Sequence, residues 1–339
     1  MIATAMSVSM QAAVVRGLYN QTFQPSFNCP TGNCTWSDIT TLGVCASCKN
    51  VSSQTSEVCG YTTYAQNSFT CTYTLPGKIL SATFFIDETD STEQLTRWNS
   101  SSTMAWGGAG TEVNGEAFLS RFEAIQVFYA TDIGKPMPAQ AWQCDLSLCL
   151  KTYATVEITN SVATVSSPVE ELLFAHDTPD SLYSDYAKWI NLTTQSEQQG
   201  SSLNYKINRA DFYNTGNYLL EMFSAGWSDG GGVDSSQDGV SSVGVPFVGP
   251  ELAISSNISE SMAILATSMT EAIRTCPNST AALGNAYVQK TFIRVSWGWL
   301  ALPLVLTLLS CIMLFLVACR TRKEGLPAWK DDQDRKSVV

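Results

Sequence analysis

The sequence predicts an α+β protein, in which a strand-rich, disulfide-stapled extracytoplasmic region with a few helices precedes one C-terminal transmembrane helix. Three observations lead to this prediction. The stretch from Trp299 to Cys319 is apolar and carries no charged residue. All but two of the cysteines, and every N-glycosylation acceptor site, come before that stretch. Alternating apolar residues bounded by turn residues are typical of strands, and they recur through the same region.

The apolar stretch 299–319 matches the length of a membrane-spanning helix. A hydrocarbon core about 30 Å thick requires roughly 20 apolar residues in helical form. Pro303 falls near the start, where the missing N–H costs little, and Trp297 and Trp299 suit the outer headgroup region. Basic residues follow at once and mark the cytoplasmic side: Arg320, Arg322 and Lys323. We therefore expect a cytoplasmic tail at 320–339.

Cysteines and glycosylation sites predict that residues 1–298 lie outside the cytoplasm, at the plasma membrane or in the secretory pathway. The acceptor sites have the pattern Asn-x-Ser/Thr with x not Pro: Asn20, Asn33, Asn50, Asn99, Asn191, Asn257 and Asn278. Disulfides persist in that compartment, and the candidates for them are Cys29, Cys34, Cys45, Cys48, Cys59, Cys71, Cys144 and Cys149. The remaining cysteine of this region, Cys276, is the one that we expect to stay unpaired.

Residues 1–22 are predicted to be an N-terminal helical segment. The composition of 5–18 suits a helix, Gly17 could end it, and a short packing helix is the simplest interpretation. The opening MIATAMSVSMQAAVVRG lacks the apolar core of roughly 7–15 residues that defines a signal peptide. Because a large extracytoplasmic region needs a segment that starts its translocation, we expect hydrophobic segments upstream of Met1 in a longer protein.

Residues 23–80 are predicted to be a small cysteine-rich module. Cysteines at short intervals among turn residues are typical of a loop-rich fold stapled by disulfides. The six cysteines of this module allow about 15 pairings, and their spacing favours none of them. Cys45-x-x-Cys48 also has the spacing of zinc ligands or of a thioredoxin-type motif. The acceptor sites at Asn33 and Asn50 lie inside the module and favour disulfides.

Three sequence blocks together resemble a known family. The block CPTGNCTW, the following LGVCASC, and VSWGWLALP leading into an apolar helix are similar to an uncharacterised family of filamentous-fungal membrane proteins, a domain of unknown function. The resemblance covers roughly residues 20–330. It implies further transmembrane helices near the N-terminus, then a cysteine-rich extracytoplasmic region, then one C-terminal helix. The upstream helices are not in this chain. The resemblance thus implies a topology and brings no catalytic residue, cofactor or activity.

Residues 81–298 are predicted to form the α+β part of the extracytoplasmic region. We expect a strand at 78–90, a loop at 91–115, and a strand in the second half of 118–131. The spacing of Cys144 and Cys149 allows a local disulfide between them. Residues 151–159 and 162–165 are expected to pair as a hairpin, with the turn at Asn160 and Ser161.

The second half of this region alternates between strands, loops and helices. A short strand at 203–207, a helix at 211–223 and a glycine- and serine-rich loop at 226–250 are expected in that order. The strongest helical pattern lies at 258–275, where Asn257 or Ser259 could cap the start. Its apolar stripe is interpreted as core: Ile258, Met262, Leu265, Met269 and Ile273. The alternation in 286–297 predicts a strand that leads into the membrane.

No catalytic, cofactor-binding or metal-binding residue is assigned from the sequence. Gly226 to Gly230 match the nucleophile elbow G-x-S-x-G, but a polar loop follows instead of a helix, and the only histidine, His176, precedes Ser228. His176 is interpreted as a solvated loop residue. The glycine-rich loop also carries three aspartates that lack the spacing of a calcium loop: Asp229, Asp234 and Asp238.

Carboxylates that are adjacent in the sequence do not indicate a catalytic site either. Asp87 and Glu88, like Glu170 and Glu171, are adjacent in sequence. Because neighbours on a strand point to opposite faces, adjacency does not create the facing pair that a glycosidase requires.

These patterns favour a non-enzymatic, membrane-anchored glycoprotein that binds a wall polymer, another membrane or surface protein, or a smaller ligand. The net charge of −11 leaves no basic footprint for nucleic acid, so the lipid bilayer is the first expected partner. Two alternatives stay open: an extracytoplasmic hydrolase anchored by its C-terminus, and an accessory part of a transporter. Several carboxylates that converge in one deep cleft would favour the hydrolase.

Overall fold

The structure is a computed structural model of the chain. It describes residues 6–21, 27–61, 68–76, 80–87, 97–104, 114–127, 139–177, 189–195, 205–224, 226–228, 249–276, 279–288, 290 and 292–324. The chain forms two compact units, Met1–Tyr287 and Val288–Val339. Strands, five helices, four disulfides and a C-terminal apolar helix among these residues confirm the predicted α+β class.

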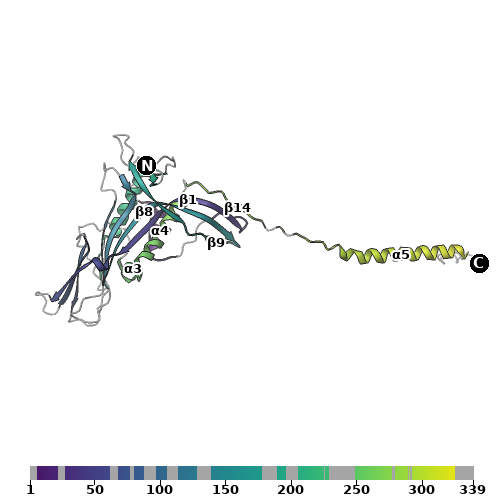
Figure 1. Ribbon diagram of the computed structural model, residues 1–339, viewed down its shortest axis with the longest axis horizontal. Coiled ribbons are helices and arrows are strands. Elements are labelled where there is room, and N and C mark those ends of the chain that lie inside the picture. Colours follow the sequence, from purple (N-terminus) through teal and green to yellow (C-terminus); the bar gives the residue numbers. More distant parts are fainter. Residues whose placement is uncertain are drawn as a thin grey trace, which may run out of the picture. The chain divides into compact units, whose positions relative to one another are not determined.

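An eleven-stranded sheet dominates the first unit as far as the described residues show it (Figure 1). Its main path runs β12-β11-β10-β8-β7-β5-β13, with β1, β14, β6 and β9 attached at the sides. The strands are β1 (Cys34–Asn50), β5 (Arg97–Thr103), β6 (Asn114–Glu116), β7 (Phe118–Val127), β8 (Ala139–Thr159), β9 (Val162–Val165), β10 (Val169–Asp177), β11 (Trp189–Thr194), β12 (Tyr205–Asn208), β13 (Gly226–Ser228) and β14 (Asn285–Ala286).

Strand β8 is the central strand of this sheet. Its 21 residues would span about 70 Å in extended form. Along one edge it pairs antiparallel with β1, from Cys34 opposite Ile158 to Asn50 opposite Trp142. Along its other edge it pairs in turn with β7, β10 and β9. A single strand therefore connects regions that are far apart in the sequence.

A second, three-stranded sheet packs on part of the first. It consists of β2 (Ser56–Tyr61), β3 (Ser68–Thr74) and β4 (Ser81–Asp87), and a short 3-10 helix, η1 (Ser52–Gln54), leads into it. Its buried side chains, among them Phe69 and Tyr73, form one core with Ile125, Val127 and Ala141 of β7 and β8. The β4 strand confirms the strand predicted at 78–90.

Strand β7 is buried on both faces, and this explains its mixed apolar pattern. Phe122 and Ala124 join the main core, whereas Ile125 and Val127 join the core under the small sheet. Alternate residues of a strand point to opposite faces. Because both faces are covered, the apolar residues do not alternate with polar ones. The strand nevertheless covers all of 118–127, not only the second half that the sequence predicted.

Four helices of the first unit contribute to the main core. They are α1 (Val8–Leu18), α2 (Arg209–Met222), α3 (Gly249–Ile254) and α4 (Ile258–Arg274). Leu219 of α2, Leu252 of α3 and Met262 of α4 pack in one cluster with Leu146 and Leu148 of β8. The predicted helices at 211–223 and 258–275 are thus confirmed, and the Asn257 side chain caps α4 by accepting from the Glu260 N–H at 3.2 Å.

Helix α1 is a packing helix, as predicted, but Gly17 does not end it. The helix continues to Leu18, and Gly17 is buried against α4. A Cβ at Gly17 would lie 2.6 Å from the Leu265 Cα. The Ser268 hydroxyl donates to the Ala13 carbonyl at 2.7 Å across the same contact. Glycine is required there because it lets two helix backbones come close together.

Helix α4 also covers the outer edge of β1. The Thr270 hydroxyl oxygen accepts from the Val44 N–H at 3.0 Å. A Cβ at Gly43 would lie 2.9 Å from the Thr270 methyl, so glycine again allows the close approach. Unpaired groups on an edge strand invite pairing with other chains. The threonine satisfies one of these groups from the side.

The disulfides pair differently from the local pattern that the sequence suggested. They join Cys29 to Cys34, Cys45 to Cys149, Cys48 to Cys144, and Cys59 to Cys71. A local Cys144–Cys149 disulfide is therefore wrong. The idea of a module stapled within 23–80 is wrong for β1 as well, because the antiparallel register brings its cysteines beside those of β8. Cys276 is free and exposed, as expected.

The structure also contains the predicted β8–β9 hairpin and a strand inside the predicted loop at 91–115. The hairpin of β8 and β9 is confirmed, and positive φ angles of 52° at Asn160 and 65° at Ser161 form its turn. The predicted loop at 91–115 is wrong in part, since β5 lies inside it. Ser100 and Ser102 hide the strand pattern because they are buried and hydrogen-bonded, and the Ser102 hydroxyl lies 2.9 Å from the Ser120 hydroxyl.

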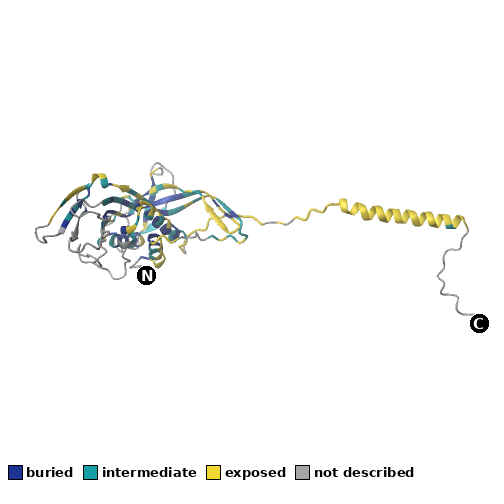
Figure 2. Ribbon diagram, turned by 90° about the horizontal axis from the view of Figure 1, so that it is seen from below, coloured by how far each residue is buried: buried dark blue, intermediate teal, exposed yellow. Residues whose placement is uncertain are grey.

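The second unit contains α5 (Gly298–Lys323), the one described helix that is long and apolar enough to cross a membrane. Figure 2 shows it exposed along nearly its whole length. Apolar side chains on every side of a helix are typical of a span in lipid. The strand predicted at 286–297 is mostly wrong, because pairing ends with β14 at Ala286 and residues 292–296 form neither helix nor strand.

Candidate functional site

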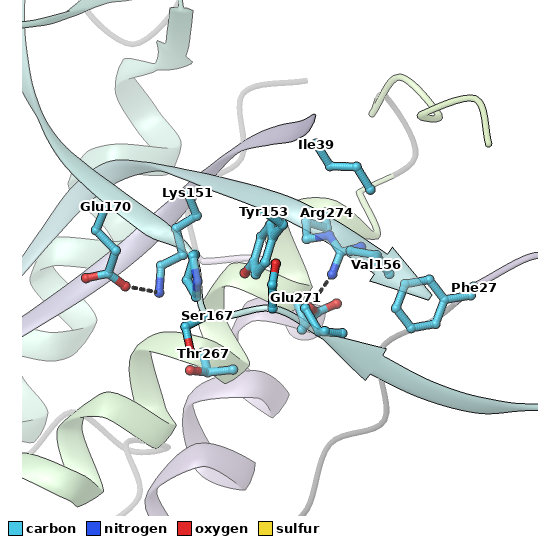
Figure 3. Close-up of a pocket in the computed structure, with 13 residues that line it drawn as sticks. Phe27, Ile39, Lys151, Tyr153, Val156, Ser167, Glu170, Thr267, Glu271 and Arg274 are labelled. Carbon is cyan, nitrogen blue, oxygen red and sulfur yellow. Dashed lines mark hydrogen bonds and ion pairs between the residues drawn. The ribbon is translucent and has the colours of Figure 1, made fainter. Parts of the chain in front are cut away.

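A cavity of about 330 Å³ lies between the sheet and the C-terminal half of α4 (Figure 3). Its walls come from β1, β8, the end of β9, the segment between β9 and β10, the start of β10, α4 and the segment before β1. The polar and aromatic residues that define its chemistry are Lys151, Tyr153, Glu170, Glu271, Arg274 and Phe27. They are separated by up to hundreds of positions in the sequence, and the fold brings them together.

Local geometry explains why these side chains point to one place. Lys151 and Tyr153 are two apart on β8 and so share one face of the strand. Thr267, Glu271 and Arg274 are four and seven positions apart on α4 and so share one face of the helix. The cavity forms where the strand face and the helix face meet.

Two ion pairs stand side by side in the cavity. Lys151 Nζ lies 3.0 Å from Glu170 Oε1, and Lys151 is only 5% exposed. Arg274 Nη1 donates to Glu271 Oε1 within one turn of α4, and Glu271 is 4% exposed. Buried charges need partners because their removal from water is costly. Each pair joins one positive and one negative group, so the cavity has no net formal charge.

Burial changes the acidity of two groups in the cavity. It raises the pKa of Glu271 above its ordinary value, and Arg274 and then Lys151 offset part of that rise with their positive charge. It also raises the pKa of Tyr153, which Arg274 lowers and the carboxylates of Glu271 and Glu170 raise further. The Tyr153 hydroxyl therefore keeps its proton at neutral pH and can donate a hydrogen bond.

Aromatic residues join the cavity to the FNCPTGNCTW block. The Arg274 guanidinium carbon lies 5.8 Å from the centre of the Phe27 ring. That ring lies 5.8 Å from the Trp36 ring. A Cβ at Gly284 would fall 2.3 Å from the Trp36 indole nitrogen, so glycine is needed beside the indole. The most specific block of the sequence thus supports one end of the cavity.

The same block ties together the end of the sheet. The Ser161 N–H donates to the Gly32 carbonyl at 2.9 Å, and the Asn160 N–H donates to the Asn33 side chain at 3.1 Å. The Cys29–Cys34 disulfide closes this loop. The loop therefore holds the β8–β9 turn in place. The β8 residues that line the cavity lie just before this turn.

Of the residues considered from the sequence, Glu170 lies in the cavity, whereas the others lie away from it or outside the described residues. His176 lies on β10, not in a loop; it is exposed, and its Nε2 is 3.0 Å from the Thr193 hydroxyl. Ser228 lies on β13, a strand paired with β5, rather than at a strand-to-helix turn. The three loop aspartates, and Glu88 and Gly230, lie outside the described residues.

One group of possible metal ligands comes together among the described residues: Glu57, Cys59 and Cys71. Cys59 and Cys71 form a disulfide, so neither sulfur is a thiolate. Zinc binds cysteine as thiolate, and the group does not fit such an ion. Cys45 and Cys48 likewise pair with β8 cysteines and do not form a zinc or thioredoxin-type site.

The glycosylation candidates differ in exposure. Asn20, Asn50 and Asn257 are exposed, whereas Asn33, Asn99 and Asn191 are half-buried. Asn278 lies outside the described residues. A glycan is attached at the side-chain nitrogen, which needs access to solvent. The three exposed asparagines are therefore the best acceptors.

Comparisons with protein-family models, with curated proteins and with solved structures found no match for this chain. The resemblance to the fungal membrane-protein family therefore stays a prediction from the sequence blocks.

The sequence indicated none of the cavity residues as a site, because Glu170 was notable only for its neighbour Glu171 and that adjacency indicates no site. Lys151 and Tyr153 lie in a strand that was predicted, and Glu271 and Arg274 in a helix that was predicted. One signal was available: two charged residues of opposite sign, Glu271 and Arg274, lie three apart near the end of an amphipathic helix. Which strand they face depends on long-range packing, and no local pattern encodes it.

Proposed function

We propose that this chain is a membrane-anchored extracytoplasmic glycoprotein that binds a ligand, without catalytic activity. The observation that carries the proposal is the sorting of features around α5. All four disulfides and every acceptor site precede it, and a basic cluster ends it. Disulfides persist outside the cytoplasm, and basic residues favour the cytoplasmic side. Both features support one orientation, at the plasma membrane or in the secretory pathway.

Endoglycosidase digestion tests this topology. We expect digestion of the full chain, expressed in eukaryotic cells, to increase its gel mobility. Replacing the exposed acceptors Asn20, Asn50 and Asn257 by glutamine should reduce the shift. The control is Arg335→Asn, which places an Asn-Lys-Ser site in the tail and should add no glycan. Glycan on that tail site, with none on the sites before α5, would reverse the orientation.

The cavity between β8 and α4 is the proposed ligand site. Its two ion pairs balance, so a charged ligand would have to displace an existing partner. A neutral ligand rich in hydroxyl groups can accept from Tyr153 and donate to Glu170 while the rings of Phe27 and Tyr153 cover its apolar face. A few polar groups in a mostly apolar cavity are typical of small-molecule sites. A neutral saccharide of a wall polymer fits this chemistry.

Calorimetric titration with a neutral β-glucan oligosaccharide tests the site. Tyr153→Phe removes only the hydroxyl and should weaken binding about tenfold, the value of one hydrogen bond near 1.4 kcal/mol. The control Tyr61→Phe, on an exposed residue of β2, should leave binding unchanged. Equal binding by the Tyr153→Phe variant and the unchanged protein would count against the cavity as the site.

A hydrolase is the second candidate, and one observation favours it. Glu170 and Glu271 line the same cavity, and the environments differ: Glu271 is buried with a raised pKa, whereas the Glu170 side chain is 44% exposed. Glycosidases pair a protonated carboxyl with an ionised one. Incubation with the same oligosaccharide separates the two candidates, because a hydrolase would release reducing ends and lose that activity with Glu271→Gln.

A further inference from the structure

Residues 292–297, the segment just before α5, carry large apolar side chains that are exposed to solvent. Phe292 and Ile293 are each 86% exposed, Val295 is 56% exposed and Trp297 is 73% exposed. In Figure 2 this segment is exposed up to the start of the helix. Single exposed apolar residues are common on proteins, but a contiguous group marks a surface that another phase or molecule covers.

Residues 292–297 belong to no strand among the described residues. In the first unit, the Tyr287 N–H donates to the Asn33 carbonyl at 2.8 Å. Residues 292–296 form neither helix nor strand, and they belong to the same compact unit as α5. The period of two in Ile293, Val295 and Trp297 resembles a strand, yet it is not paired with a strand of the described residues.

Covalent continuity with α5 determines what lies near this segment. Trp297 directly precedes Gly298, the first residue of the helix. An extended chain advances at most about 3.5 Å per residue, so Ile293 lies within about 17 Å of the helix start. The headgroup layer on each side of a bilayer is roughly 5–8 Å thick. The segment can therefore lie along that layer over its whole length.

The charges of the segment suit a lipid surface as well. Arg294 is the charged residue of the segment, Lys290 lies just before it, and no acidic residue occurs from Tyr287 to Lys323. Long basic side chains next to a membrane-spanning helix can reach the polar headgroups. Tryptophan and other amphipathic side chains are enriched at the same level. The exposed apolar side chains, the absence of acidic residues and the position next to α5 all indicate the headgroup layer as the partner.

We propose that residues 292–297 lie in the headgroup layer of the bilayer and bind its lipid surface next to α5. This proposal rests on the proposed function, since it requires α5 to cross the membrane. It predicts that the chain enters the bilayer through an interfacial segment rather than through a strand that continues from the sheet.

Site-specific fluorescence on the full chain tests the proposal. In a background of Cys276→Ser, Cys311→Ala and Cys319→Ala, a single cysteine at Ile293→Cys is labelled with a dye whose emission shifts in apolar surroundings. The protein is reconstituted in vesicles of phosphatidylcholine and phosphatidylserine, with or without nitroxide-labelled lipid. We expect a blue shift, and a loss of emission when nitroxide lipid is present.

Two further label positions make each outcome decisive. Val305→Cys, inside α5, reports the span, and Leu283→Cys, on an apolar residue that is 97% exposed, should show neither shift nor quenching. Quenching at 305 without quenching at 293 would overturn this inference and leave the span intact. A blue shift at 293 without quenching would mean that protein covers the segment, which also overturns it. No quenching at either position would refute the membrane anchor itself.

Discussion

Removing both disulfides between β1 and β8 should cost about 7 kcal/mol, although removing either one should cost only about 3 kcal/mol. Cys45–Cys149 and Cys48–Cys144 close loops of 104 and 96 residues in sequence separation. With one bond intact, the other closes a ring of only about ten residues, because the chain entropy of the long loop is already lost. The two bonds are therefore strongly non-additive.

The measurement is denaturant unfolding of the full chain in detergent, followed by tryptophan fluorescence. The variants replace Cys45 and Cys149, Cys48 and Cys144, or all four, by alanine. A loss of about 7 kcal/mol approaches the whole stability of a typical domain, so the variant without either bond should be largely unfolded. The result that contradicts the prediction is a four-alanine variant as stable as either two-alanine variant.

The Cys59–Cys71 disulfide is the matched control. Like Cys48–Cys144, it joins directly opposite residues of two antiparallel strands, and its sequence separation is 12. Its removal should cost about 3 kcal/mol in any background, because its short ring lies inside the long loops and changes their length only slightly. Additivity there, beside non-additivity between β1 and β8, would assign the effect to the shared long loop.

Replacing Arg274 by leucine should destabilise the protein by about 3 kcal/mol at neutral pH, because the buried carboxylate of Glu271 loses its partner. We expect the lower end of the range for buried ion pairs, since Lys151 remains nearby and also acts on Glu271. Adding Glu271→Gln should restore most of the loss, because the unpaired charge is then gone. Urea unfolding of the two single variants and the double variant measures the coupling.

The effect should depend on pH in a direction that the pKa of Glu271 determines. Burial raises that pKa in the folded protein above its ordinary value of 4.5. The folded state then binds the proton more tightly than the unfolded state, so stability falls as the pH rises from 4.5 through the raised pKa. Without Arg274 the pKa rises further, so the falling window reaches higher pH and the loss of stability is larger.

Comparison across pH therefore provides the decisive test. The deficit of the Arg274→Leu variant should shrink toward acid pH, where Glu271 is protonated with or without its partner. Arg16→Leu, at an exposed position near the end of α1, is the control and should cost less than about 1 kcal/mol at every pH. A deficit at Arg274 that is the same at acid and neutral pH would show that packing, not charge, causes it.

Local patterns predicted much of the fold. The stripe from Ile258 to Met269 is buried core, and Asn257 caps its helix. The turn at Asn160 and Ser161 joins β8 to β9. These features depend on residues within a few positions of one another, and periodicity and turn chemistry report such contacts directly. Predictions failed where polar residues are buried, as in β5, where hydrogen bonds allow Ser100 and Ser102 to lie in the interior.

Gly17 shows a second kind of failure. A glycine near the end of a helical pattern is typical of a C-cap. Here it lies inside α1, because α4 approaches its backbone too closely for a side chain. The reason lies in a partner more than two hundred residues away, and neighbouring residues carry no trace of it.

The sequence by itself determined the division of the chain: an apolar helix near the end, a basic cluster after it, and the disulfides and acceptor sites before it. This division follows from the residue types within each stretch, which can be interpreted without knowing how distant stretches pack. Only the tertiary structure decided which cysteines pair and which side chains meet in the cavity of Lys151, Glu170 and Glu271. Both depend on the register of β1 against β8 and on the packing of α4. Contacts of this range arise from the joint burial of many residues, so no single stretch of the sequence encodes them.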